Sequence, residues 1–296
     1  MTGIDFPYRT YFAIKDLGIQ RVLHRWPRLM RGIKRSVHFI LPKKPVWLRV
    51  RSGISAGMWM RLRLPQEVRY WRGEHERAIQ DAIAAMVLPG AVVYDIGAHI
   101  GSFALGATRL TGQAGRVVAF EADPENVASL VENASRNNLT ATLQVVPCAV
   151  WSRTTTRVAF RRGGVQRTHG GVETDGQRTV LGSGDMIQVP AIALDDFIKG
   201  GGPIPQLVKI DVEGGEYEVL RGGEKLFAAG RPLIIAEVHH LQTAEQIAAW
   251  LTEYHYRAQW TIPSEGFPRH MFAWPQHRDA TSWAGLGRGR SCSTGN

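Results

Sequence analysis

From residue 91 onward, short apolar runs alternate with amphipathic stretches along the chain. The apolar runs have the length and composition of buried strands, and they occupy 91–95, 116–121, 142–146, 206–211, 232–238, 256–262 and a last segment near 270–274. Apolar residues follow helical spacing at 102–111, 124–137, 216–228 and 243–254. Strands that alternate with helices predict an α/β fold with a parallel, doubly wound sheet.

Other segments depart from this alternation and suggest how the chain is organised. Residues 46–64 alternate in polarity and predict a β-hairpin, while 74–88 have helical spacing and end at Pro89-Gly90. The stretch 151–192 is rich in Gly, Arg and Thr, which predicts an inserted hairpin with a mobile loop over the site. We expect an N-terminal arm at 1–55, a main domain at 56–275 and a disordered tail at 276–296.

Positive charge changes the picture of the arm. Residues 1–51 hold twelve Lys and Arg but only two acids, whereas the rest of the chain is balanced. Apolar residues from Ile19 to Val37 follow helical spacing, with arginines mostly on the other face and Pro27 between them. Such a helix within 15–41 packs its apolar stripe on the domain or lies on an anionic membrane surface, and nucleic acid is a third alternative for its basic face.

The composition is that of a globular protein, with 44% hydrophobic and 21% charged residues. Two cysteines, Cys148 and Cys292, cannot form a disulfide framework, and no apolar run of about 18 residues is present to span a bilayer. We therefore expect a cytoplasmic protein, or one bound peripherally to the inner face of the membrane.

The sequence from Val92 to Phe103 has the pattern of a ligand-binding turn. An apolar strand leads through Asp95, Gly97 and Gly101 into a helix, so backbone amides face the turn. An acid before the glycines opposes a pyrophosphate and favours a cationic cofactor with an amino-acid moiety. The next strand ends at Glu121, where an acid can bind both hydroxyls of a ribose.

Carboxylates also follow two later strands. Asp211 and Glu213 follow the strand at 206–211, and Glu237 and His239 end the strand at 232–238. Ligands of open α/β sheets bind at this edge, so these side chains are catalytic candidates, with His239 the base best suited to neutral pH. Asp211, Glu237 and His239 together are a candidate site for a divalent metal, although a hydrogen-bonded acid–histidine pair is the more ordinary arrangement.

Three segments together resemble the FkbM-type methyltransferase family: D-I-G-A-H-I-G from Asp95, V-V-A-F-E-A-D-P-E-N around Glu121, and L-V-K-I-D-V-E-G-G-E around Asp211, the last followed by I-I-A-E-V-H. The resemblance runs from about Tyr70 to Pro275. It implies a Rossmann-like class I methyltransferase fold, with a seven-stranded, mostly parallel sheet whose last strand is antiparallel. It also implies S-adenosylmethionine as cofactor and O-methylation of a hydroxyl on a sugar, a glycan or glycolipid, or a secondary metabolite.

The same resemblance assigns roles by position. Asp95, Gly97, Gly101 and His99, which stands where the family often has Asn, would contact the methionine part, Glu121 the ribose, Cys148 and Ala149 the adenine, and Asp211 and Glu213 the reacting methyl. Glu121 alone would also suit an NAD-type Rossmann oxidoreductase, and a catalytically idle scaffold of this fold is a third alternative. A nucleic-acid methyltransferase is disfavoured because the sequence has no Pro-Pro dipeptide. It therefore lacks the Asn/Asp-Pro-Pro-aromatic loop of enzymes that methylate the amino groups of bases, and we expect no nucleic-acid partner.

Overall fold

The computed structural model describes residues 44–163, 171–172, 185–261 and 266–276. Two compact units divide them: a smaller one with 44–46 and 62–68, and a larger one with 47–61 and the residues from 69 onward. The predicted arm helix, the tip of the insertion and the tail from 277 lie outside the described residues, and their predictions are untested. Within the described ranges, no helix has the length and apolar character needed to cross a membrane.

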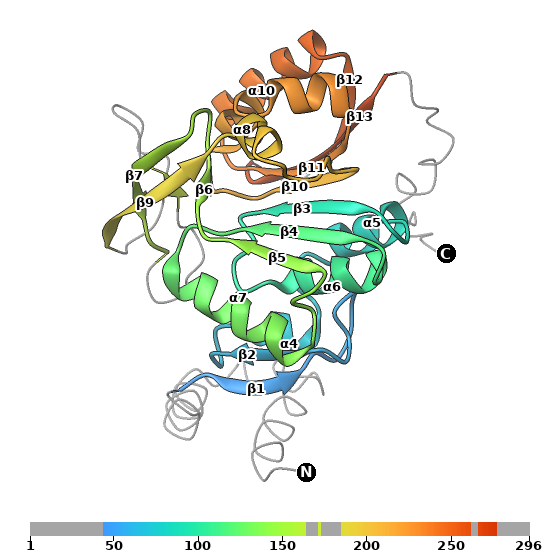
Figure 1. The fold of residues 1–296 in the computed structure, drawn as a ribbon, viewed down its shortest axis with the longest axis vertical. Coiled ribbons are helices and arrows are strands. Elements are labelled where there is room, and N and C mark those ends of the chain that lie inside the picture. Colours follow the sequence, from blue (N-terminus) through green and yellow to red (C-terminus); the bar gives the residue numbers. More distant parts are fainter. Residues whose placement is uncertain (1–43, 164–170, 173–184, 262–265, 277–296) are drawn as a thin grey trace, which may run out of the picture. The chain divides into compact units, whose positions relative to one another are not determined.

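A seven-stranded sheet is the centre of the larger unit (Figure 1). In spatial order its strands are β12 (Tyr256–Trp260), β13 (Arg269–Pro275), β11 (Leu233–Val238), β10 (Leu207–Ile210), β3 (Val92–Ile96), β4 (Arg116–Phe120) and β5 (Leu143–Val146). The last strand in sequence, β13, is antiparallel to both of its neighbours, whereas the pairs from β11 to β5 are parallel. The predicted fold class and all seven predicted strands are therefore confirmed.

Helices cover both faces of this sheet (Figure 1). One face carries α6 (Ser102–Thr111) and α7 (Pro124–Arg136), and the other carries α8 (Leu194–Lys199) and α10 (Leu241–Glu253). The remaining helices are α4 (Val68–Arg72), α5 (Arg77–Met86) and α9 (Glu216–Arg221). The prediction of one continuous helix over 216–228 was wrong. α9 ends at Arg221, and a separate π-helical turn, Leu226–Gly230, follows it. A Cβ on Gly222 would lie 2.1 Å from the carbonyl oxygen of Trp151, so the chain approaches too closely there for a side chain.

The insertion forms a second, four-stranded sheet in the order β6-β9-β7-β8. Its members are β6 (Ala149–Val150), β7 (Thr155–Arg161), β8 (Gly171–Val172) and β9 (Met186–Ile192), and β7 pairs with β9 in the predicted antiparallel hairpin. Trp151, Phe160 and Val189 form a small core of its own. In the N-terminal part, β1 (Val46–Arg49) and β2 (Trp59–Leu62) form the two-stranded sheet that the alternation at 46–64 predicted.

Side-chain alternation separates the core from the site. Tyr94 and Ile96 of β3, Val208 and Ile210 of β10, and Ala236 and Val238 of β11 all join the main hydrophobic core with α8, α9 and α10. Successive side chains in a strand point to opposite faces, so the residues between them lie on the other face, toward α6. Those residues include Asp95, Lys209 and Glu237, which places charged groups on one face near the carboxyl ends of three adjacent strands.

Candidate active site

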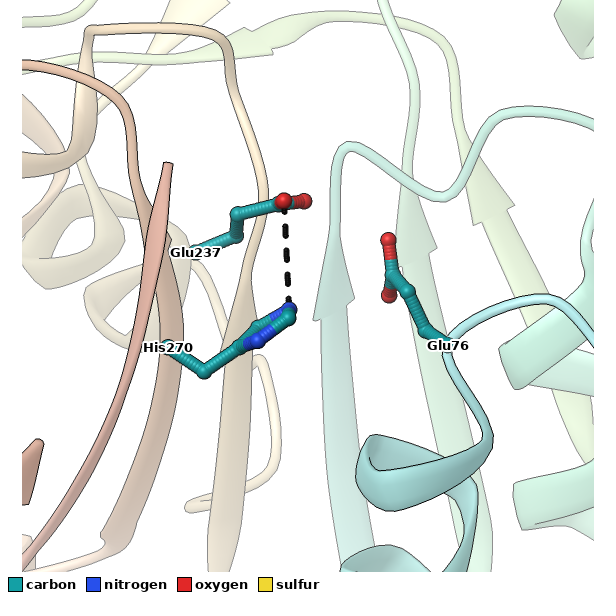
Figure 2. A group of neighbouring side chains, drawn as sticks. All are labelled: Glu76, Glu237 and His270. Atoms are coloured by element: carbon teal, nitrogen blue, oxygen red, sulfur yellow. Dashed lines mark ion pairs between the residues drawn. The ribbon is translucent and has the colours of Figure 1, made fainter. Parts of the chain in front are cut away.

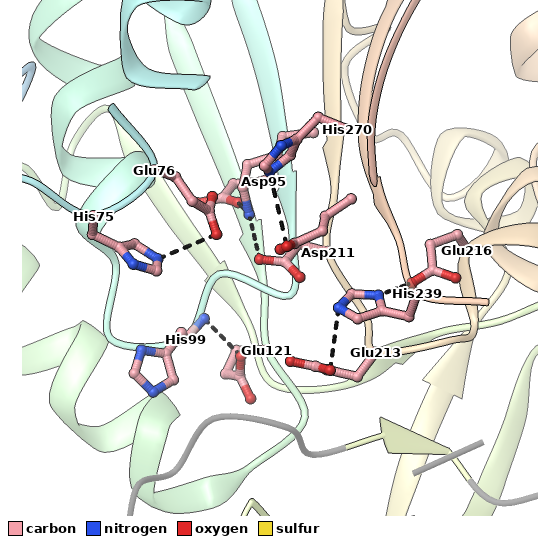
Figure 3. Close-up of polar contacts among 12 residues, drawn as sticks. His75, Glu76, Asp95, His99, Glu121, Asp211, Glu213, Glu216, His239 and His270 are labelled. Atoms are coloured by element: carbon pink, nitrogen blue, oxygen red, sulfur yellow. Dashed lines mark hydrogen bonds and ion pairs between the residues drawn. The ribbon is translucent and has the colours of Figure 1, made fainter. Parts of the chain in front are cut away.

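Polar side chains gather where β3, β10 and β11 end, and most come from the three sequence motifs (Figure 3). Lys209 is directly beside Asp95 in the β3–β10 register, and Asp211 follows β10 on the same face. Glu237 and His239 continue that face on the next strand. The structure therefore brings the predicted acids together from positions more than a hundred residues apart.

Lys209 is the buried cation of this group, with 4% of its surface exposed. Its ammonium Nζ lies 3.3 Å from Oδ1 of Asp95 and 3.4 Å from Oδ2 of Asp211. Burial alone would lower the pKa of Lys209, but the two carboxylates outweigh burial and raise it. For Asp211 burial opposes ionisation, yet Lys209 and His239 lower its pKa overall, so Asp211 stays ionised. Sequence reasoning gave Lys209 no role, although its alternation with Asp211 could have indicated this pairing.

Asp95 is buried, with 2% of its surface exposed. Burial raises its pKa, and Lys209 opposes that change. Neither carboxylate oxygen of Asp95 has a hydrogen-bond partner in the part of the chain that the structure describes. Because an unsatisfied buried carboxylate is costly, this position suits a cationic group of a ligand in addition to Lys209.

The glycines of the turn are required by close packing. Gly97 has φ +77°, and a Cβ there would lie 1.8 Å from the backbone oxygen of Asp211. Gly101 has φ +90°, and its Cβ would meet Leu130 of α7 at 2.2 Å. Leu130 thus lies directly against Gly101, and the turn fits tightly between α7 and the end of β10. The contact of Gly101 with the methionine part stays a prediction.

Glu121 joins the turn after β3 to the loop after β4. Its Oε2 accepts a hydrogen bond from the backbone N–H of His99 at 2.7 Å, and its Oε1 accepts one from Asp123 N–H at 2.8 Å. Burial raises the pKa of Glu121 to about 7. The N-cap of α7 is Asp123, which accepts from the N–H of Glu125 at 2.8 Å, so Glu121 is not the cap. Each oxygen of Glu121 retains a lone pair for a ribose hydroxyl.

The two residues expected near adenine lie at the start of the insertion. Cys148 is 7% exposed and belongs to the main core, and burial raises the pKa of its thiol to about 12. Ala149 begins β6 and packs in the core of the second sheet. Both follow β5, at the same edge as the other motifs, and their contact with adenine stays a prediction.

His239 lies between two carboxylates (Figure 3). Its Nδ1 is 2.7 Å from Oε1 of Glu216, which is fully buried, and its Nε2 is 3.2 Å from Oε2 of Glu213. Burial would lower the pKa of His239, but the hydrogen bond and charge of Glu216 raise it to about 10. An imidazole that is protonated at neutral pH cannot accept a proton there, so the structure argues against His239 as the base. The sequence analysis gave Glu216 no role in the site.

A second group unites Glu237 with two residues that the sequence analysis did not select. Glu76 before α5, Glu237 of β11 and His270 of β13 offer ligand atoms that all lie within 4.8 Å of one another (Figure 2). Burial raises the pKa of Glu76 to about 9 and that of Glu237 to about 7. The three residues predicted to bind one metal therefore fall into two groups. Asp211 and His239 lie with Glu213, whereas Glu237 lies with Glu76 and His270.

Three non-glycine residues of the site have left-handed backbone conformations. They are Glu76 at φ 45°, His99 at φ 52° and Glu213 at φ 54°. The His99 ring also stacks on Tyr70, with ring centroids 5.5 Å apart. Left-handed backbone costs about 1 to 2 kcal/mol for a residue with a Cβ, so the surrounding packing must hold these positions. Such strain gathers at sites where side-chain placement matters.

A sequence profile described as the methyltransferase FkbM domain matches residues 95–258, which include all three motifs. A curated relative, the hexuronic acid methyltransferase AglP of Haloferax volcanii, is 27% identical over 187 residues. That alignment covers 62% of this chain and 72% of AglP.

Solved structures of other methyltransferases are also similar. The methyltransferase FkbM from Methylobacillus flagellatus KT has 17% identity and a TM-score of 0.46, covering 62% of this chain and 43% of that one. The match thus spans less than half the length of that protein. The precorrin-6y C5,15-methyltransferase from Geobacter metallireducens GS-15 has 15% identity and a TM-score of 0.42, covering 68% of this chain and 89% of that one.

Proposed function

The chain belongs to the FkbM methyltransferase family, and on that premise we propose that it transfers a methyl group from S-adenosylmethionine to a hydroxyl oxygen of a sugar-containing acceptor. The observation that carries this proposal is the position of Asp211, which lies directly against the glycine turn at Gly97. Open α/β sheets bind ligands at this edge. A cofactor held by the turn would therefore present its reactive group to the carboxylates that follow β10.

The residues at the turn fit S-adenosylmethionine. Asp95, whose Oδ1 lies 3.3 Å from Nζ of Lys209, offers its carboxylate to the ammonium group of the methionine part. Glu121 is fixed by two backbone amides and has acceptor capacity for the ribose hydroxyls. When bound, the cofactor supplies an electrophilic methyl group on a sulfonium. The part of this chain is to align the acceptor oxygen behind that methyl.

The proton of the acceptor hydroxyl must leave as the new C–O bond forms. Asp211 and Glu213 are the carboxylates that the resemblance assigns to the reacting methyl, and we assign them to accept and share this proton. A strong base is unnecessary, since the oxygen becomes highly acidic as it gains the methyl. Lys209 keeps Asp211 ionised, and protonated His239 fixes the Glu213 carboxylate at 3.2 Å.

The charges of the site favour a hydroxyl acceptor over a carboxylate. The name of the Haloferax relative specifies a hexuronic acid, which carries both kinds of oxygen. In this chain Asp211 and Glu213 belong to one group at the sheet edge, and Glu237 belongs to the neighbouring group. A further carboxylate held among them would be repelled, whereas a neutral hydroxyl can donate its hydrogen bond to one of them.

Calorimetric titration with S-adenosylhomocysteine, followed by assay of methyl transfer to neutral hexosides and hexuronic acids, tests the proposal. We expect a dissociation constant near 1 μM, equivalent to about −8 kcal/mol, and transfer to a neutral hexoside. Glu121→Ala should weaken binding of S-adenosylhomocysteine at least tenfold, or about 1.4 kcal/mol. Glu213→Gln should bind it normally and transfer methyl about 100-fold more slowly.

Glu253→Gln, at the exposed end of α10, is the matched control and should change neither measurement. Tight binding of NAD with no binding of S-adenosylhomocysteine would overturn the proposal in favour of an oxidoreductase. Binding without transfer to any hydroxyl, combined with transfer to a hexuronic acid carboxylate, would overturn the choice of acceptor.

A further inference from the structure

Two carboxylates and one imidazole converge beside the proposed methyl-transfer site. Glu76, Glu237 and His270 come from the segment before α5, from β11 and from β13, and all three point toward one another (Figure 2). Their side chains are 15%, 16% and 25% exposed, so the group is largely removed from solvent. Each can offer a ligand atom within 4.8 Å of the other two.

The backbone fixes this arrangement. Glu237 and His270 are direct partners in the antiparallel register of β11 and β13, so their side chains leave the sheet side by side. Glu76 is in the left-handed conformation at φ 45°, immediately before α5 begins at Arg77. That strained turn aims the Glu76 carboxylate at the cross-strand pair, as Figure 2 shows.

The polar atoms of the group are only partly satisfied by the part of the protein that the structure describes. Nε2 of His270 is fully buried and has no hydrogen-bond partner among residues 44–163, 171–172, 185–261 and 266–276, and its distance to Oε1 of Glu237 is 3.8 Å. Glu76 has an ion-pair contact of 3.5 Å with His75. The buried cation Lys209 is engaged by Asp95 and Asp211 instead. Within the described residues, the group thus combines two carboxyl groups that contact each other with an imidazole nitrogen that has no hydrogen-bond partner.

We propose that Glu76, Glu237 and His270 bind a divalent first-row transition-metal ion, for which Mn²⁺ is the probe. Oxygen ligands suit Mn²⁺ and imidazole suits the first-row metals, so this mixed set fits better than a site for Mg²⁺ or Ca²⁺. Bonds of about 2.1 Å place two ligands of one ion roughly 3 to 4.3 Å apart. The observed spacing needs only small side-chain movements to reach that range. The two carboxylates balance the charge of the ion.

The neighbouring group of Asp211, Glu213 and His239 is the weaker candidate for the metal. Both ring nitrogens of His239 already contact carboxylates, at 2.7 and 3.2 Å. The imidazolium itself therefore neutralises that group, and both of its ring nitrogens are already engaged. His270, by contrast, has an unused nitrogen directed at two acids.

The role of the ion rests on the proposed function. Three protein ligands leave coordination positions for water or for oxygens of the acceptor. A sugar with neighbouring hydroxyls could bind there through two oxygens, which would orient a hydroxyl toward Asp211. Metal binding itself is measured without cofactor or acceptor, so its failure is distinguishable from failure of the proposed function.

The test is titration of the full-length, chelator-treated protein with Mn²⁺, with free Mn²⁺ followed by electron paramagnetic resonance. We expect one ion per chain with a dissociation constant in the micromolar range. Glu237→Gln and His270→Asn should each weaken binding at least tenfold, and Zn²⁺ should displace Mn²⁺. Glu245→Gln and His255→Asn, at exposed positions of the same region of sequence, are controls that should bind Mn²⁺ as the wild type does.

Binding of S-adenosylhomocysteine and circular dichroism show whether each variant is folded. A folded wild-type protein without stoichiometric Mn²⁺ binding would overturn the proposal. So would Mn²⁺ binding that is unchanged in folded Glu237→Gln and His270→Asn. Loss of binding in His239→Gln, with full binding in His270→Asn, would place the ion in the neighbouring group and would equally overturn the assignment.

Discussion

The ammonium group of Lys209 neutralises the carboxylates of Asp95 and Asp211, which would otherwise repel each other at the ends of β3 and β10. Its ammonium lies 3.3 Å from Asp95 and 3.4 Å from Asp211, and all three groups are largely buried. Lys209→Met keeps the stem but leaves both acids without a cation. We expect the free energy of unfolding to fall by about 3 to 5 kcal/mol, as measured by chemical denaturation.

Lys199→Met, at the exposed end of α8, is the matched control and should change stability by less than about 0.5 kcal/mol. Adding Asp95→Asn to Lys209→Met should restore part of the loss, because one uncompensated charge is then removed. If Lys209→Met alone leaves the midpoint unchanged, the ion pairs do not contribute to the fold.

The pair of His239 and Glu216 makes stability depend on pH in a defined direction. Burial lowers the pKa of His239, but Glu216, together with Glu213 and Asp211, raises it overall from 6.5 to about 10, so the folded chain binds a proton that the unfolded chain releases near pH 6.5. This stabilisation is complete below pH 6.5 and is lost as the pH rises toward 10. Replacing Glu216 with Gln should destabilise the protein by about 1 to 3 kcal/mol at pH 6 and by much less at pH 10.

Denaturation curves at both pH values measure this difference, and His255→Gln, at an exposed histidine, serves as the control. Other groups titrate in the same interval, but they contribute equally to wild type and variant. Equal destabilisation by Glu216→Gln at pH 6 and pH 10 would mean that His239 is neutral in the folded protein, which would return it to the list of candidate bases.

Among the elements, Arg162 connects the inserted sheet to the loop that carries the proposed ribose site. Arg162, directly after β7, contacts Asp123 at 2.9 Å and Glu125 at 2.8 Å. Asp123 caps α7 and donates its backbone N–H to Glu121. Arg162→Ala should loosen this loop and weaken binding of S-adenosylhomocysteine about three- to tenfold, which is a cost of roughly 1 kcal/mol.

Hydrogen exchange over residues 121–126 should rise in the same variant, and Arg162→Lys should recover part of the binding. Arg157→Ala, at an exposed position on the same strand, provides the comparison. Faster exchange without weaker binding would show that the insertion stabilises α7 but does not position Glu121.

The sequence predicted most of the strands and helices, and it also indicated on which face of the sheet a strand residue lies. Buried parallel strands are continuous apolar runs, and their polar ends mark the edge where ligands bind, so Asp95, Glu121 and Asp211 could be selected directly. Alternation within β10 and β11 also carried the information that Lys209, Asp211 and Glu237 share one face. The break after α9 was missed because it depends on how closely Trp151 approaches Gly222, a contact between distant segments.

At the scale of the whole molecule, the sequence did not indicate which strands pair with each other or in what register. Glu76 and His270 join Glu237 only because β13 pairs antiparallel with β11 and because the chain turns sharply before α5. Neither fact has a signal in local composition. The protonation state of His239 could not be predicted from the sequence either, since it depends on contact with the buried Glu216, 23 residues away in sequence. Motifs therefore predicted which strand ends carry chemistry, and the structure was needed to show which side chains meet.

The basic arm is the part of the chain whose role still depends on the sequence alone. We propose that residues 15–41 bind an anionic membrane surface, since arginines lie opposite Trp26, Leu29 and Ile33 in helical spacing. Each basic residue near such a surface contributes about 1 kcal/mol. Full-length protein should therefore float with vesicles that contain phosphatidylserine, and 0.5 M salt, which shortens the screening length to roughly 4 to 5 Å, should release much of it.

Reversal of three arm charges separates this proposal from its alternative. Arg21→Glu, Arg25→Glu and Arg28→Glu together should abolish flotation, whereas reversal of the exposed Arg153, Arg157 and Arg257 in the main domain should not. On this proposal, the free energy of unfolding should be equal in both triple variants. Unchanged flotation, or equal binding to uncharged vesicles, would instead favour an arm whose apolar stripe packs on the domain and whose arginines face water.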